Sequence, residues 1–187
     1  MTLLLAASSV FSSSENDVHI LKRLDEFMKD PQCDQSKMRS LLESGKMDGF
    51  FTADEVKLIF GHLSEKYHEY VSSKVIGHTV HNNDLFAYYL ASNKGANSNL
   101  TKSKVLFTGA HHAREVITTN MIVKIFLETL HSLVHKHQKL KFWNYCDVII
   151  VPIVNLDSYQ MISKSFGTSK WRTNSMKRKN MNKKYCR

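Results

Sequence analysis

The order of periodic segments constrains the fold of this 187-residue chain more than any other feature. Residues 52–71 carry apolar side chains at helical spacing, and two alternating segments, 75–80 and 85–91, predict a hairpin across residues 81–84. A short apolar strand then ends at Gly109, followed by an expected helix over residues 118–137 and an apolar strand over residues 148–154. Beyond Asp157 the periodicity fades. The order α-β-β-β-α-β predicts an α/β architecture with a mixed sheet.

The strand that ends at Gly109 is followed at once by His112 and Glu115 in an HxxE pair. Open α/β sheets place their sites at the carboxyl ends of strands. Zinc accepts both imidazole nitrogen and carboxylate oxygen, so this pair is a candidate metal site. A second HxxE pair, His62 and Glu65, lies within the expected helix 52–71 and is interpreted as part of a solvated helix face, since short motifs also arise by chance.

Four segments in the same order resemble known sequences of one family. GAHHAREVIT resembles the GxHAREW(I/V) block of the zinc carboxypeptidases of the carboxypeptidase A/B type. Residues 51–91 resemble that family's amino-terminal helix and hairpin, VIIVPIVNLDSYQ its PxxNPDGY turn, and KRKN its WRKNR block. The resemblance covers about three quarters of the chain, from residue 51 to residue 187. It implies a mixed-sheet α/β/α zinc carboxypeptidase-like fold, incomplete at the carboxyl end.

The resemblance also assigns roles to individual residues. It implies that His112 and Glu115 are ligands of one Zn²⁺ ion and that Arg114 lines the substrate cleft. The family's arginine that polarises the scissile carbonyl corresponds to Arg178, a catalytic and substrate-binding residue. Arg172, in the sequence WRTN, is the alternative for that role, and the choice between the two stays open.

The chain departs from the family pattern in several places. Leu156 and Ser158 stand where the family has proline and glycine, so that turn must be built differently, and Lys177 replaces a tryptophan. No histidine follows His137, so the family's third zinc ligand is missing, as is its general-base glutamate. The chain is therefore expected to be the front part of a metallocarboxypeptidase, which removes carboxyl-terminal residues from peptides, and to be truncated and inactive as written. The alternative is a catalytically dead binding module of the same fold.

Basic residues are concentrated at one end of the chain. The net charge is +9, and residues 158–187 hold nine Lys or Arg and no acidic residue. Such a run can bind phosphate backbones, which makes a nucleic-acid-binding protein the runner-up. No aromatic interleaving or nucleic-acid fold signature accompanies the charge, so we expect peptide or protein carboxyl termini as partners and no nucleic acid. Cleavage specificity and oligomeric state stay open.

The amino-terminal fifty residues precede the family-like blocks. Residues 1–14 are apolar and then serine-rich, as in a secretory signal, but no basic residue precedes the apolar run, so a secreted or endomembrane location is one of two open interpretations. No stretch approaches the roughly 20 apolar residues of a membrane span. Residues 15–50 are expected to form a helical extension with two short helices, either the remnant of a prosegment or a plain extension. Residues 51–187 are interpreted as the amino-terminal part of a zinc carboxypeptidase domain.

Two further histidines have metal-ligand spacing. His131 and His135 are four residues apart near the end of the expected helix 118–137. Histidines also suit a helix carboxyl end for electrostatic reasons, and we favour that structural interpretation.

Overall fold

A four-stranded mixed sheet organises the chain, as the sequence predicts. The computed structural model describes residues 14–91, 102–135 and 146–166. The strands are β1 (Val71–His78), β2 (Asp84–Leu90), β3 (Ser103–Thr108) and β4 (Cys146–Val151), in the spatial order β1-β2-β4-β3. β2 pairs antiparallel with both β1 and β4, whereas β3 and β4 are parallel. Parallel strands need a crossover, and the helix α4 (Val116–Val134) provides it.

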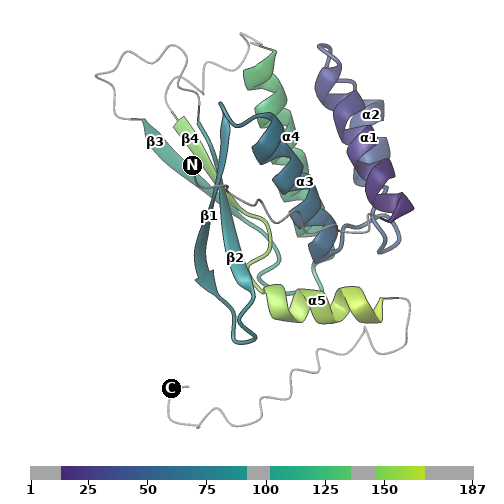
Figure 1. The fold of residues 1–187 in the computed structure, drawn as a ribbon, viewed down its shortest axis with the longest axis vertical. Helices are drawn as coiled ribbons and strands as arrows, with labels where there is room; N and C mark the ends of the chain where they lie inside the picture. Colours follow the sequence, from purple (N-terminus) through teal and green to yellow (C-terminus); the bar gives the residue numbers. More distant parts are fainter. Residues whose placement is uncertain (1–13, 92–101, 136–145, 167–187) are drawn as a thin grey trace, which may run out of the picture.

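Helices cover one face of this sheet in the described part of the chain (Figure 1). α3 (Ala53–Lys66) and α4 pack directly on the strands, and α1 (Glu15–Lys29) and α2 (Gln35–Leu42) form an outer layer. The core is aromatic at its centre: the ring of Phe60 in α3 stacks on Tyr88 of β2 at 4.3 Å and lies 4.8 Å from Phe126 of α4. These contacts fix α4, and with it the segment that precedes α4, against the sheet.

Two stretches differ from the sequence-based expectation, and the strand expected over residues 148–154 runs instead from Cys146 to Val151. The helix expected to reach Val71 ends at Lys66, and the prediction was wrong because a turn intervenes, in which Val71 donates a backbone hydrogen bond to the Tyr67 carbonyl. Val71 then starts β1 opposite Leu90, four residues before the predicted strand. The second difference is an unpredicted helix, α5 (Leu156–Ser165), in the region where periodicity fades.

The predicted amino-terminal helices are present and share the hydrophobic core of the rest of the chain. Ile20, Leu24 and Phe27 of α1 are fully buried. Residues 1–13 of the expected signal sequence lie outside the described residues, and Ser14 caps α1 through a capping box. No helix in the described ranges combines the length and apolar character needed to cross a bilayer.

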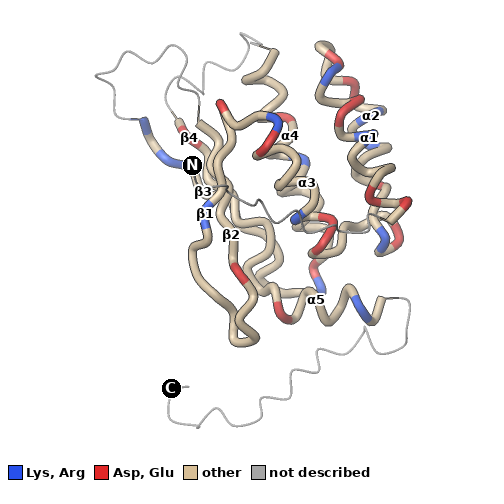
Figure 2. Tube along the Cα trace, in the orientation of Figure 1, with Lys and Arg blue, Asp and Glu red and all other residues tan. Residues whose placement is uncertain are grey.

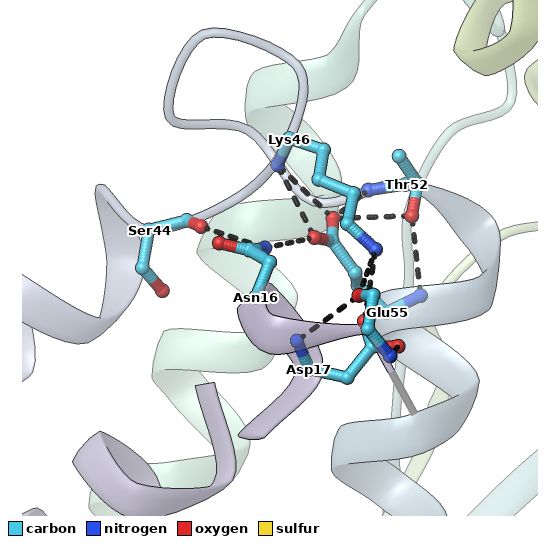
Figure 3. A network of polar contacts seen from close by, with 7 residues as sticks. Asn16, Asp17, Ser44, Lys46, Thr52 and Glu55 are labelled. Carbon is cyan, nitrogen blue, oxygen red and sulfur yellow. Dashed lines mark hydrogen bonds and ion pairs between the residues drawn. The ribbon is translucent and has the colours of Figure 1, made fainter. Parts of the chain in front are cut away.

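A buried carboxylate joins α1, the segment after α2, and α3 (Figure 3). Glu55, only 1% exposed, accepts hydrogen bonds from the Asn16 side-chain amide (2.7 Å), the Thr52 backbone (2.8 Å) and the Lys46 backbone (3.2 Å). Lys46 also forms an ion pair with Asp17 at 2.9 Å. Thr52 and Glu55 form a capping box at the start of α3, and the Glu55 carboxylate additionally fastens the first helix to the third.

The other end of α1 is fastened to α4 by the two histidines with metal-ligand spacing. Nε2 of His131 donates to the Asp30 carbonyl, and Nε2 of His135 donates to the Met28 carbonyl at 2.9 Å. A carbonyl only accepts, so both Nε2 atoms carry a proton. The two histidines therefore have a structural role, through hydrogen bonds to α1 that the sequence did not indicate.

The charges of the described helices are mixed in sign. Lys and Arg are interspersed with Asp and Glu along α1 and α3, whereas the charged residues of α2, Lys37 and Arg39, are basic (Figure 2). Most of the basic segment 158–187 lies outside the described residues, since the described part ends at residue 166.

Candidate metal centre

The segment between β3 and α4 carries the candidate ligands at the carboxyl end of β3. Backbone hydrogen bonds tie it to the segment that follows β4: Gly109 donates to Val151 (3.0 Å), and the Gly109 carbonyl accepts from Val154 (3.0 Å). Asn155 donates to the Ala110 carbonyl at 3.1 Å. The two strand ends therefore hold each other, as the parallel pairing of β3 and β4 requires.

Gly109 is required by close packing. A Cβ atom at this position would lie 2.6 Å from the Pro152 carbonyl oxygen and 3.0 Å from Cγ1 of Ile122. The next residue, Ala110, has φ of +48°, a left-handed conformation that costs energy for any residue with a side chain. The chain thus leaves the strand through a tight, closely packed turn, and the candidate ligands follow directly.

His112, Arg114 and Glu115 are all exposed, whereas the intervening Ala113 and the following Val116 are buried. The buried pair anchors the segment in the core while the three polar side chains face solvent. The Glu115 backbone donates to the His112 carbonyl at 2.9 Å, which closes a turn between the two candidate ligands. Glu115 occupies the N-cap position of α4, but its carboxylate makes no capping hydrogen bond.

The donor set suits a zinc ion but is incomplete within the described residues. Neither the His112 imidazole nor the Glu115 carboxylate forms a hydrogen bond or ion pair with another described side chain, so both are available as ligands. Catalytic zinc takes three protein ligands, and no group of three or more His, Cys, Asp or Glu able to hold a metal occurs in the described ranges. The segment offers two candidate ligands, and a third donor would have to come from outside it.

The remaining histidines and arginines considered for the site either have other partners in the fold or lie outside the described residues. His111 follows the end of the strand at Thr108, and its Nε2 is 2.8 Å from the Thr108 hydroxyl. His62 of the second HxxE pair forms an ion pair with Asp25 at 2.9 Å. Arg178 and its alternative Arg172 lie outside the described residues.

The NLDSY segment is the start of α5, and it contacts both the hairpin and the candidate site. Asp157 accepts hydrogen bonds from the Asn83 side chain (2.8 Å) and the His81 backbone (3.3 Å). Burial raises the pKa of Asp157, but hydrogen bonds from Thr79, Asn83 and His81 outweigh it and hold that pKa below 3.8. Tyr159 donates to the Phe51 carbonyl at 2.7 Å, which fixes α5 beneath α3.

Sequence reasoning missed two residues that hold the candidate site together. The Thr118 hydroxyl bonds to Ala110 and Glu115, and the Asn155 side chain donates to the His111 carbonyl at 3.3 Å. Asn155 was noted only as part of a family-like turn. No local sequence signal indicates either contact, since each joins residues brought together by the fold.

Comparison with known proteins settles the family. The family model described as zinc carboxypeptidase matches residues 59–187, more than half of the chain. The chain belongs to the zinc carboxypeptidase family. Its fold is that of the solved carboxypeptidases: it superimposes on thrombin activatable fibrinolysis inhibitor with a TM-score of 0.57 at 18% identity, and on carboxypeptidase A from Helicoverpa armigera with 0.53 at 19%. These alignments cover 87% and 82% of this chain.

One curated relative is the protein of Saccharomyces cerevisiae named inactive metallocarboxypeptidase ECM14. It is 23% identical over 172 residues, which cover 80% of this chain. The match covers 40% of the yeast protein's length, and the structural matches cover 37% and 35% of the two solved chains. This zinc carboxypeptidase family member therefore spans well under half the length of the relatives it matches.

Proposed function

We propose that this zinc carboxypeptidase family member carries the first two ligands of a catalytic zinc site, His112 and Glu115, in a protein that hydrolyses peptides at their carboxyl termini. The observation that carries the proposal is the position of this pair. Both side chains are exposed and unengaged at the carboxyl end of β3, on a turn fastened to the core by the buried Ala113 and Val116. The pair also lies inside the family-matched residues.

Each polar residue of the segment has a defined chemical task in this proposal. His112 and Glu115 offer one imidazole nitrogen and one carboxylate to the ion. A bound zinc ion supplies Lewis acidity and a water molecule that ionises near neutral pH. Arg114 can bind a substrate carboxylate through its planar guanidinium. Arg178 is proposed to stabilise charge on the scissile carbonyl oxygen.

A catalytically dead binding module is the second candidate, and one specific observation favours it: the yeast relative is named inactive. Both candidates recognise peptide carboxyl termini, and neither calls for nucleic acid. Release of carboxyl-terminal amino acids from a peptide by the purified protein, abolished by a chelator and by His112→Ala, supports the enzyme. Peptide binding without release supports the binding module.

The metal assignment is tested by titrating the 187-residue chain with Zn²⁺ and following the imidazole signals by NMR. The chain offers a matched control because it contains a second HxxE pair. We expect His112→Ala to abolish the zinc-dependent shifts and His62→Ala to leave them unchanged. Binding should be weak, because two ligands leave half of the coordination shell to water. Zinc binding that survives His112→Ala would refute the assignment.

A further inference from the structure

One hydroxyl group joins the two ends of the segment that carries the candidate ligands. The Oγ1 atom of Thr118, in the first turn of α4, accepts a hydrogen bond from the Ala110 backbone at 2.9 Å. The same atom donates to the Glu115 carbonyl at 2.7 Å. Ala110 and Glu115 are the first and last residues of the segment that carries the candidate ligands, so Thr118 closes this segment into a ring.

The bond to Ala110 cannot readily be replaced by solvent. Ala110 is only 1% exposed, and a buried backbone N–H without an acceptor is unfavourable. Its carbonyl is already engaged by the Asn155 backbone at 3.1 Å. Ala110 also has the left-handed φ of +48°, so its conformation depends on the surrounding hydrogen bonds. Removing the Thr118 hydroxyl would release the turn at its entrance.

The consequence reaches both candidate ligands. His112 lies two residues after Ala110, whose backbone N–H donates to the Thr118 hydroxyl. The Glu115 carbonyl accepts from that hydroxyl and from the Thr118 backbone N–H at 3.0 Å. The spacing of the imidazole and the carboxylate therefore depends on the ring closed by the hydroxyl. Groups that orient metal ligands without contacting the metal affect affinity strongly, since a chelating pair must be held at one separation.

We infer that Thr118 is a positioning residue of the metal site, whose hydroxyl fixes the separation of His112 and Glu115. The inference rests on the proposed function, because it assumes that these two residues bind zinc. It adds a residue that contacts neither the metal nor the substrate. Because the hydroxyl makes both hydrogen bonds, serine at this position should preserve zinc affinity, whereas valine, which has the size of threonine but no hydroxyl, should not.

The test compares the 187-residue chain with its Thr118→Val and Thr118→Ser variants in Zn²⁺ titrations followed by NMR. Thr118→Val should weaken zinc binding about ten-fold, the lower end of the range known for groups that orient metal ligands. Thr118→Ser should bind zinc as the unmodified chain does. Thr129→Val is the matched control, because Thr129 is a mostly buried threonine (8% exposed) three turns further along the same helix. That variant should bind zinc normally.

A loss of protein stability in these variants can be distinguished from a loss of zinc affinity. Urea unfolding of the metal-free variants shows whether Thr118→Val and Thr129→Val differ in stability. If Thr118→Val does not fold, Thr118→Ala against Thr118→Ser gives the same comparison. Equal zinc affinity of the hydroxyl-free and hydroxyl-bearing variants overturns the inference, and so does failure of serine to restore binding. Absence of His112-dependent zinc binding in the unmodified chain overturns the proposed function itself, which is a different result.

Discussion

Replacing Glu55 with alanine would remove the carboxylate that holds α1 and the segment after α2 to α3 (Figure 3). The side chain is 1% exposed, and its oxygens accept hydrogen bonds from Asn16, Lys46 and Thr52. In Glu55→Ala those donors lose their acceptor, and the capping box of α3 loses one of its two bonds.

The expected loss of stability follows from these contacts. Hydrogen bonds to a charged group contribute about 1.5–3 kcal/mol each, and donors left unsatisfied cost about 1–3 kcal/mol. The flanking Asn16, Lys46 and Thr52 are only partly buried, so water can partly replace the lost acceptor. We therefore expect the free energy of unfolding to fall by about 3–4 kcal/mol, less than the sum of the separate bonds.

Urea unfolding followed by circular dichroism measures this change. Glu65→Ala is the matched control, since Glu65 lies on the same helix and is exposed. Its free energy of unfolding should change by no more than about 0.5 kcal/mol. A loss below about 1 kcal/mol in Glu55→Ala would refute the reasoning, because it would mean that the network does not fasten α1 to the rest of the fold.

Three further predictions concern single positions. Gly109→Ala should lower the free energy of unfolding by about 1–3 kcal/mol, because the new Cβ would clash with the Pro152 carbonyl. Gly61→Ala should raise it by about 0.5–1 kcal/mol, because Gly61 lies inside α3 and a Cβ there meets nothing within 4 Å. Equal effects of the two substitutions in urea unfolding would contradict this prediction. His131→Phe should cost about 0.5–1.5 kcal/mol, since it keeps a ring beside Phe27 but removes one of the two hydrogen bonds that the Asp30 carbonyl accepts, the other coming from the Cys33 backbone at 3.3 Å; unchanged stability would show that the bond is dispensable. The pKa of Asp157 measured by NMR should lie below 3.8. The ionised carboxylate therefore stabilises the fold above pH 3.8, and this stabilisation is lost as the pH falls through the folded-state pKa. A measured pKa above 3.8 would contradict the hydrogen bonds assigned to Asp157.

Local patterns were sufficient to predict the order of the elements and the position of the candidate ligands. The alternating hairpin segments and the apolar run before Gly109 indicate strands, and the HxxE pair follows that run. Which side chains are buried does not follow from these patterns, since Ile76 is 50% exposed and Leu106 is 60% exposed. α5 was not predicted, because its stability comes from long-range contacts: Tyr159 bonds to the Phe51 carbonyl and Asp157 bonds to the hairpin turn. A periodicity search within residues 156–165 cannot detect such contacts.

The residues that hold the candidate site in place could not be predicted either, because they also act through contacts that the fold creates. Thr118 and Asn155 act by hydrogen bonds to the segment 110–115, and neither residue type has a local pattern that indicates such bonds. The role of the amino-terminal helices was likewise open between a prosegment remnant and an extension. In the structure they share one core with α3 and α4 and are fastened at both ends of α1, by Glu55 and by His131 and His135.

We propose that His112 and Glu115 together hold one Zn²⁺ ion at the carboxyl end of β3. The most direct test is a crystal structure of the zinc-soaked chain with an anomalous difference map recorded at the zinc absorption edge. We predict one peak within ligand distance of both the His112 imidazole and the Glu115 carboxylate. A zinc peak at His62 and Glu65, or any zinc site that excludes His112 and Glu115, would contradict the account.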